Sequence, residues 1–311
     1  MASPIQVVKS GSFTGHRDCV YALEPSGLPE VFFSAAGDGM VVQWNLEVPD
    51  QGQLIARIPA SVYALHYFAP AEQLWIGQNF DGLHVIDLAT RQEVKSVKIT
   101  SAAIFDIKAW QDTVFAATGD GLIQAIDVHS MAVRKHLKAS DRSVRCLAIH
   151  PHRNELAAGY SDHCIRIFDL NTYALKYVLT SHTNSVFTIA YSPDGQHLLS
   201  GGRDAHLKGW NVAEGYSLQH SVVAHLYAIN HLAFSPDGRY FATGSMDKSI
   251  KVWDAATFRL LKVIDRARHA GHGTSVNKLL WSNHHNQLVS CSDDRTISVW
   301  ELDFNRLNTI N

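Results

Sequence analysis

Four histidines in the chain are followed, at fixed distances, by a hydroxyl residue, an aspartate and a tryptophan. The hydroxyl residue comes 18 positions after the histidine, the aspartate four later and the tryptophan six after that. Out of context, Ser, His and Asp suggest the catalytic triad of a hydrolase. A triad is made once, at one site, whereas this set is made four times with identical spacing, which favours a structural role. The four sets are His16, Ser34, Asp38 and Trp44; His182, Ser200, Asp204 and Trp210; His225, Thr243, Asp247 and Trp253; and His272, Ser290, Asp294 and Trp300.

The structural role has a physical cause. The indole N–H of a tryptophan on a buried strand must find an acceptor. A hydroxyl on the adjacent strand can accept it and donate onward to the imidazole, while an aspartate at a tight turn holds the other imidazole nitrogen. Each neutral link contributes about 0.5–1.5 kcal/mol, and more where the carboxylate takes part. Asp120 and Asp162 keep the turn acid without the His or Trp, so their repeats must rely more on packing.

The elements that position these sets recur along the whole chain. Seven apolar runs end in a residue pair at steps of 42, 40, 42, 42, 43 and 47 residues. A period in the forties with such an ending predicts four-stranded propeller blades. The seven pairs are Trp44-Asn45, Ile86-Asp87, Ile126-Asp127, Phe168-Asp169, Trp210-Asn211, Trp253-Asp254 and Trp300-Glu301.

Short strands joined by tight turns make up the clearest repeat. Residues 185–191 alternate between small or polar and apolar side chains, and a Ser-Pro-Asp-Gly turn follows at 192–195. Period-2 patterning without a helical period indicates an antiparallel, all-β unit. We therefore predict one domain over residues 1–311, a seven-bladed β-propeller of four-stranded antiparallel blades. The blades should occupy about residues 5–302, with a tail at 303–311.

The two ends of the chain are expected to meet in one blade. The chain stops soon after the third strand of the last repeat, and a strand at residues 5–9 precedes the first repeat. This N-terminal strand is predicted to complete the last blade and close the ring, which leaves no unpaired sheet edge. Removal of residues 1–12 should then destabilise the whole protein.

At this point the chain resembles the WD40-repeat family, as a single seven-bladed propeller. A Gly-His element appears at Gly15-His16 and Gly271-His272, and in weakened form at Ser181-His182 and Ala224-His225; the closing Trp-Asp pair is literal at Trp253-Asp254. The resemblance covers about residues 5–302. It is specific for the fold and says little about the partner.

Composition narrows the classes of function. The 27 basic and 29 acidic residues give a net charge of -2, which argues against direct nucleic-acid or anionic-membrane binding. The sequence predicts neither a signal peptide nor a transmembrane helix. The four cysteines are interpreted as free thiols in a reducing compartment: Cys19, Cys146, Cys164 and Cys291. We therefore expect a cytoplasmic protein, or a nuclear one in a eukaryote. Among the 18 histidines, two clusters, His269 with His272 and His284 with His285, lack a nearby Cys or carboxylate at ligand spacing, so neither a metal nor a cofactor is expected.

The resemblance implies a binding site on the top face, around the central channel. Its positions flank the apolar residue that opens each inner strand, here Val20, Val62, Ile104, Val144, Val186, Ile229 and Val276. Aromatics and arginine, the residue types enriched at binding hot spots, occupy five of the seven following positions. These seven are Tyr21, Tyr63, Phe105, Arg145, Phe187, Asn230 and Asn277. Rim positions add Cys19, Ser61, Ser143 and Ser185, and the residues before the turn acids add Arg203, Met246 and Asp293.

Two interpretations of the aromatic positions stay open, because some rings could pack between blades. If they bind, the rings would hold an apolar or cationic side chain, and Arg145 and Arg203 an acidic one. Blades 1 to 5 should be used more than blades 6 and 7. We expect a non-enzymatic scaffold that binds a peptide segment of a partner protein, as a monomeric propeller within a larger complex. The alternatives are an enzyme or small-ligand binder using the central funnel, and a subunit of a nucleoprotein-associated complex.

Overall fold

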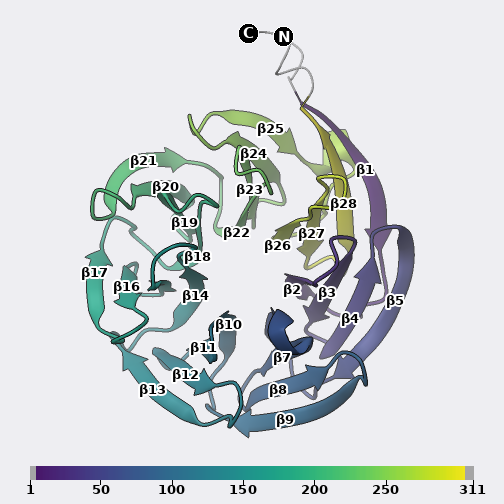
Figure 1. Ribbon diagram of the computed structural model, residues 1–311. Helices are drawn as coiled ribbons and strands as arrows, with labels where there is room; N and C mark the ends of the chain where they lie inside the picture. Colours follow the sequence, from purple (N-terminus) through teal and green to yellow (C-terminus); the bar gives the residue numbers. More distant parts are fainter. Residues whose placement is uncertain (1–4, 305–311) are drawn as a thin grey trace.

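Seven four-stranded antiparallel sheets are arranged in a ring (Figure 1). The computed structural model describes residues 5–304, and the sheet count refers to that range. Six sheets are built from consecutive strands, so that each repeat of the sequence forms one blade with its first strand innermost. The predicted seven-bladed propeller is confirmed.

The strands are short, as the spacing of the turns requires. Blade 1 contains β2 (Val20–Pro25), β3 (Val31–Ala36), β4 (Met40–Asn45) and β5 (Val48–Arg57). Blade 2 contains β6 (Val62–Phe68), β7 (Gln73–Gln78), β8 (Gly82–Asp87) and β9 (Gln92–Lys98), with the 3-10 turn η1 (Ala69–Ala71) after β6. Blade 3 contains β10 (Ile104–Trp110), β11 (Thr113–Thr118), β12 (Leu122–Asp127) and β13 (Val133–Lys138).

The second half of the ring repeats this arrangement. Blade 4 contains β14 (Val144–Ile149), β15 (Glu155–Tyr160), β16 (Ile165–Asp169) and β17 (Leu175–Leu179). Blade 5 contains β18 (Val186–Tyr191), β19 (His197–Gly202), β20 (His206–Asn211) and β21 (Ser217–Val223). Blade 6 contains β22 (Ile229–Phe234), β23 (Tyr240–Ser245), β24 (Ile250–Asp254) and β25 (Leu260–Ile264), followed by α1 (Arg266–His269). Blade 7 contains β26 (Val276–Trp281), β27 (Leu288–Ser292) and β28 (Ile297–Asp303).

The N-terminal strand closes the ring. β1 (Gln6–Phe13) pairs antiparallel with β28, and the last sheet has the order β1-β28-β27-β26. Figure 1 shows β1 in purple along β28 in yellow. The predicted closure is confirmed, and the strand runs four residues beyond the predicted end at position 9. β28 continues to Asp303, inside the stretch predicted as tail, whereas residues 305–311 of that stretch lie outside the described residues.

The hydrophobic core lies between the blades. The buried apolar side chains of residues 5–304 form seven clusters, and each cluster draws on two neighbouring blades. Ile5, for example, packs with Trp300 of its own blade and with Val252 of blade 6. Because every blade is sandwiched between two others, stability depends on neighbour contacts all round the ring. Neither helix found in residues 5–304 approaches the length or apolarity that a membrane span requires.

Every inner strand has a β-bulge at the same place. The strand's first residue pairs with the second strand, the next residue is skipped, and regular pairing resumes one position later. A bulge bends its strand and redirects the extra side chain. The seven skipped residues are Tyr21, Tyr63, Phe105, Arg145, Phe187, Asn230 and Asn277.

Candidate functional site

The seven bulged residues all line the central channel. They are half-buried, and none belongs to an interblade core cluster. The rings predicted at these positions therefore pack around the mouth of the channel and not between the blades. Their exposure to the channel leaves surface for a ligand, whereas a ring in the core would have none.

Blades 1 to 5 contribute a continuous row of rings and one guanidinium. Tyr21 meets Tyr63 edge to face with centroids 4.8 Å apart, and Tyr63 stacks on Phe105 at 6.0 Å. The guanidinium carbon of Arg145 lies 3.8 Å from the Phe105 centroid and 5.0 Å from that of Phe187. We call Tyr21, Tyr63, Phe105, Arg145 and Phe187 the aromatic arc.

Arg145 supplies the positive charge of the aromatic arc. Burial lowers the pKa of its guanidinium, while nearby groups favour the charged form; an arginine stays protonated even so. Within the described residues Arg145 has neither a carboxylate partner nor a side-chain hydrogen bond, and two aromatic faces hold it instead. A planar cation with free N–H groups in a partly desolvated place is suited to a carboxylate or another anion.

Blades 6 and 7 use their bulged residues differently. The amide nitrogen of Asn230 donates to Ser275 Oγ at 2.8 Å and to the Val276 carbonyl at 2.9 Å. That of Asn277 donates to the Val20 carbonyl at 2.9 Å and to Asp293 Oδ1 at 2.7 Å. Both amides therefore link their blade to the next one. The predicted asymmetry of the top face remains a prediction about binding, but these contacts give it a physical basis.

The predicted rim residues also link blades. Cys19 Sγ donates to the Asp293 carbonyl at 3.6 Å, across the junction of blades 7 and 1. Ser61, Ser143 and Ser185 donate to the carbonyls of Gly37, Gly119 and Ser161, each in the preceding blade, at 3.4, 2.9 and 3.4 Å. Arg203 and Met246 instead lie exposed, and Met246 lines the channel mouth together with Asp293.

The whole channel, with the aromatic arc in its lining, has a volume of about 910 Å³ and continues along the inner strands as far as Pro151 and Pro193. A charged layer crosses it: Lys108 Nζ lies 3.3 Å from Asp106 Oδ1, and Lys278 comes from the far side of the ring. Burial would raise the pKa of Asp106, but the two lysines and the backbone N–H of Leu147 hold it below its usual value. Burial and the same lysines lower the pKa of His231, whose Nδ1 accepts the Leu279 N–H at 3.2 Å. His231 is therefore neutral.

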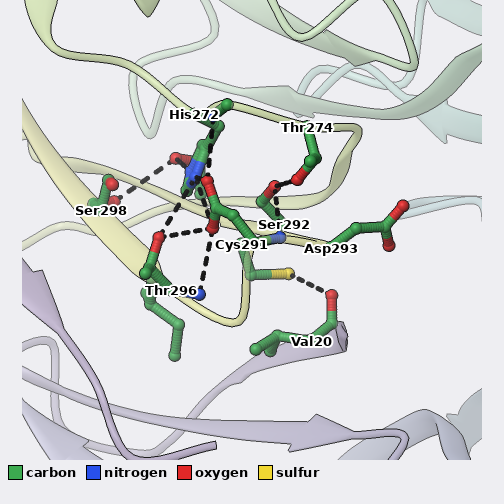
Figure 2. A network of polar contacts seen from close by, with 12 residues as sticks. Val20, His272, Thr274, Cys291, Ser292, Asp293, Thr296 and Ser298 are labelled. Carbon is green, nitrogen blue, oxygen red and sulfur yellow. Dashed lines mark hydrogen bonds and ion pairs between the residues drawn. The ribbon is translucent and has the colours of Figure 1, made fainter. Parts of the chain in front are cut away.

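The four histidine sets are joined as hydrogen-bonded chains inside their blades. The histidine Nε2 and the tryptophan Nε1 each lie 2.7–2.9 Å from the shared hydroxyl oxygen. The histidine Nδ1 lies 2.8–3.3 Å from the aspartate. Since the hydroxyl accepts the indole N–H, it donates to Nε2, and Nδ1–H donates to the carboxylate. Figure 2 shows polar contacts around His272 of blade 7, with His272 beside Thr296 and the Cys291 thiol directed at the Val20 carbonyl.

The same aspartates hold the top loops in place. Asp204 accepts the backbone N–H of Thr183 at 3.1 Å, and Asp247 accepts that of Leu226 at 3.1 Å. Burial would raise the pKa of Asp204, but the hydrogen bond from His182 and those from the backbone N–H groups of Thr183 and His206 lower it to about 2. Burial lowers the pKa of His182, and the contact with Asp204 offsets this in part. The folded blade therefore holds a buried, neutral imidazole against a partly buried carboxylate.

Family models match most of this repeated pattern. A model described as "WD domain, G-beta repeat" matches residues 7–45 and 265–301, and one described as "WD repeat-containing protein 75 first beta-propeller" matches residues 122–248. The chain belongs to the WD40-repeat family. The relatives described below match only part of the chain. WD40 propellers generally bind other proteins within complexes.

Three relatives illustrate the range of WD40 proteins that the chain resembles. It is 25% identical to striatin-3 of Homo sapiens over 211 residues, which are 66% of this chain and 22% of that protein. It is 29% identical to Protein FIZZY-RELATED 2 of Arabidopsis thaliana over 212 residues, 66% of this chain and 43% of that protein. It is 26% identical to Polycomb protein esc of Drosophila melanogaster over 133 residues, 42% of this chain and 31% of that protein. The chain thus spans less than half the length of these relatives.

The sequence patterns did not predict several channel and surface residues of this WD40 propeller. Asp106, His231 and Lys278 directly follow bulged residues, and Lys108 lies two positions after Asp106, so a search of the inner strands for titratable residues would have found them. Leu226 and Tyr227 follow His225 directly, where the other sets have mostly polar residues. Within residues 5–304, no group of three or more His, Cys, Asp or Glu residues is placed to hold a metal ion.

Proposed function

We propose that this WD40 propeller is a scaffold that binds a peptide segment of a partner protein on its top face, around the central channel. The observation that carries the proposal is the aromatic arc, a row of half-buried rings ending at a guanidinium that lacks a carboxylate partner among the described residues. Family membership supports it, because WD40 propellers generally bind other proteins. The propeller would act as one subunit of a larger complex.

The chemistry of the aromatic arc suits a peptide. Rings that already pack edge to face and stacked are held in place, so a ligand that covers them loses little conformational freedom in the protein. Tyrosine, phenylalanine and arginine at the centre of a surface are the residue types that contribute most to protein–protein affinity. The histidine sets do not compete as a catalytic proposal, since their hydroxyls are fully buried and already accept an indole N–H.

The test is a triple variant of the aromatic arc: Tyr63→Ala, Phe105→Ala and Phe187→Ala. Parent and variant are used as baits in a lysate of the source cells, and a partner held by the parent is purified and titrated against both proteins. Removing a ring that fills a binding surface should cost at least about 2 kcal/mol, or roughly 30-fold in Kd. A control variant, Leu54→Ser, alters an exposed residue on the outer strand of blade 1 and should bind as the parent does.

Folding is checked by thermal melting before binding is compared. A folded triple variant with the parent's affinity for every partner would move the site away from the top face. A partner lost by the triple variant and kept by the control would support the proposal.

A further inference from the structure

Three large apolar side chains are exposed to solvent at the top of blade 6. Leu226 is 84% exposed, Tyr227 63% and Met246 51%. Leu226 and Tyr227 lie in the loop before β22, and Met246 lies in the hairpin between β23 and β24. We call these three residues the blade 6 patch. Neighbouring exposed apolar residues of this size are typical of an interaction surface.

Hydrogen bonds hold the two segments of the blade 6 patch together. The Met246 N–H donates to the Ala228 carbonyl at 3.0 Å, and Ser245 Oγ donates to the Tyr227 carbonyl at 3.3 Å. The Leu226 N–H donates in turn to Asp247 Oδ2, the carboxylate that His225 also holds. These hydrogen bonds hold the backbone of the loop and of the hairpin in fixed positions relative to each other. A partner that covers the three side chains would therefore meet a surface whose main chain is already in place.

The other blades with a complete histidine set do not carry such a patch. After the histidine, blade 1 has Arg17-Asp18, blade 5 has Thr183-Asn184 and blade 7 has Gly273-Thr274. Before the turn aspartate, the residues matching Met246 are Gly37, Arg203 and Asp293. Since the backbone of this loop is built in the same way in all four blades, the fold does not require apolar side chains here. Their presence in blade 6 points to a partner.

Two arginines supply positive charge on the blades that precede the blade 6 patch: Arg203 of blade 5 and Arg145 of blade 4. Arg203 is exposed on the top hairpin of blade 5, and Ala205 of that hairpin accepts backbone N–H groups from Ala224 and His225, next to the patch. Met246 lines the channel mouth together with Arg145 of the aromatic arc. The carboxylates of these two blades' top loops, Asp204 and Asp247, are already bonded to their histidines, and Asp293, which shares the channel mouth with Met246, accepts the amide N–H of Asn277. This part of the top face therefore presents cations beside apolar surface.

We propose that the partner segment is an acidic peptide with apolar side chains: its apolar groups cover the blade 6 patch and a carboxylate reaches Arg203 and Arg145. This inference rests on the proposed function and names the chemistry of the ligand for the same face. A carboxylate fits Arg145 because its guanidinium is positioned by Phe105 and Phe187. A cationic side chain fits less well, since Arg145 already covers the ring faces that would attract it.

The probe for the test is a phage-displayed library of random linear peptides, selected on the full-length parent protein. Selected peptides should be enriched in Asp or Glu near apolar residues. A representative peptide is then synthesised, together with a form in which Asn or Gln replaces each acidic residue. The neutral form should bind the parent at least about 10-fold more weakly, which corresponds to one well-placed charged contact.

Two protein variants separate the two contacts. Leu226→Thr, Tyr227→Asn and Met246→Ser together install residues that blades 4 and 5 carry at the matching places, and should weaken binding at least about 10-fold. Arg203→Ala changes an exposed side chain and should weaken the acidic peptide while barely changing binding of the neutral form. The matched control, Thr183→Ala with Asn184→Ala in blade 5, should bind both peptides as the parent does.

The outcomes distinguish this inference from the proposed function. If the selected peptides bind the aromatic-arc triple variant as well as the parent, or if the parent selects none, both proposals are overturned. If the triple variant loses the peptides but they show no acidic and apolar enrichment, or if the blade 6 variant binds them normally, only this inference is overturned.

Discussion

Blades 1, 5, 6 and 7 are held internally by a complete histidine set, whereas blades 2, 3 and 4 lack one. At the position of the shared hydroxyl, the second group has Ile76, Ala116 and Ala158. At the tryptophan position it has Ile86, Ile126 and Phe168, each of which is buried. Donor and acceptor have thus been replaced together. The link between hydroxyl and indole is therefore either complete or absent, because removing one partner leaves the other buried and unsatisfied. Blade 3 keeps only the turn end of the chain, where Thr100, at the histidine position, donates to Asp120 at 2.9 Å.

Blade 4 shows what can take the place of the histidine set. Its turn aspartate, Asp162, pairs with Arg166 at 2.8 Å, and the guanidinium of Arg166 lies over the ring of Tyr160. At the bottom of the blade, buried Glu155 accepts the Tyr216 hydroxyl of blade 5 at 2.6 Å and pairs with Lys176. Blade 4 is therefore linked to blade 5 by a polar contact that the repeat pattern does not predict.

The comparison also bears on the site. Tyr63, Phe105 and Arg145, the middle of the aromatic arc, come from the three blades without a histidine set. Their positions depend on the bulges and on contacts with one another, and the bulges are common to both groups of blades. Loss of the polar chain therefore leaves the placement of the binding residues intact.

The largest effect is expected from deletion of residues 1–12. Blade 7 has a complete histidine set, yet it needs β1 as its fourth strand and Ile5 as part of the core with blade 6. Loss of that burial and of the pairing with β28 should lower the free energy of unfolding by more than about 4 kcal/mol. Thermal melting measures this. Val8→Ser, at an exposed position of the same strand, is the control, and a deletion variant that melts like the parent would contradict closure by β1.

Ser200→Ala should have the next largest effect. The change leaves the indole N–H of Trp210 and Nε2 of His182 buried without the hydroxyl that now lies 2.9 and 2.8 Å away. Two orphaned groups should cost about 2–3 kcal/mol of stability, measured by denaturant unfolding. Ser298→Ala is the matched control, because Ser298 is equally buried and its hydroxyl has no partner within the described residues. Equal losses in the two variants would show that the histidine set contributes nothing.

Most of this architecture could be predicted from the sequence because it is encoded in the spacing of residues along the chain. The His–Ser/Thr–Asp–Trp intervals, the blade count and the closing strand all follow from periods along the chain. The bulge could not be predicted, since Tyr63 and Phe187 lie in runs that read as regular strands. The stacking of Arg145 on Phe105 depends on the angle between two blades, and the blade-to-blade bonds of Asn230 and Asn277 depend on ring closure. Such contacts join residues far apart in the chain and leave no local signal.

Acidification should weaken the four blades with histidine sets. The pKa of Asp204 is lowered from 3.8 to about 2, so the folded state binds its proton less readily than the unfolded chain. The lowered pKa contributes up to about 2 kcal/mol to the free energy of unfolding. This contribution is fully present above about pH 3.8 and is lost as the pH falls toward 2. The pKa of His182 is lowered from 6.5, so its contribution also disappears as the pH falls below that value.

Denaturant unfolding as a function of pH tests this titration. Asp204→Asn removes the carboxylate, so the variant should lose less stability than the parent between about pH 4 and pH 2.5. Glu214→Gln is the control, since Glu214 is exposed, lies outside the histidine sets and accepts the hydroxyl of Ser217. An unchanged slope in Asp204→Asn would mean that the acid sensitivity of the protein arises elsewhere.

The smallest and most specific effect is the coupling between Ser200 and Trp210. If the link between hydroxyl and indole is either complete or absent, as blades 2 to 4 suggest, Trp210→Phe should cost less when Ser200 is already alanine, because the indole N–H has then lost its acceptor. A double-mutant cycle should give a coupling of about 1 kcal/mol. The control cycle pairs Ser200→Ala with Trp253→Phe, whose indole donates to Thr243 of blade 6, and should give no coupling. Coupling within a blade and none between blades would establish that each histidine set acts as one unit; additivity in both cycles would show that its bonds contribute separately, and that blades 2 to 4 could have lost them one at a time.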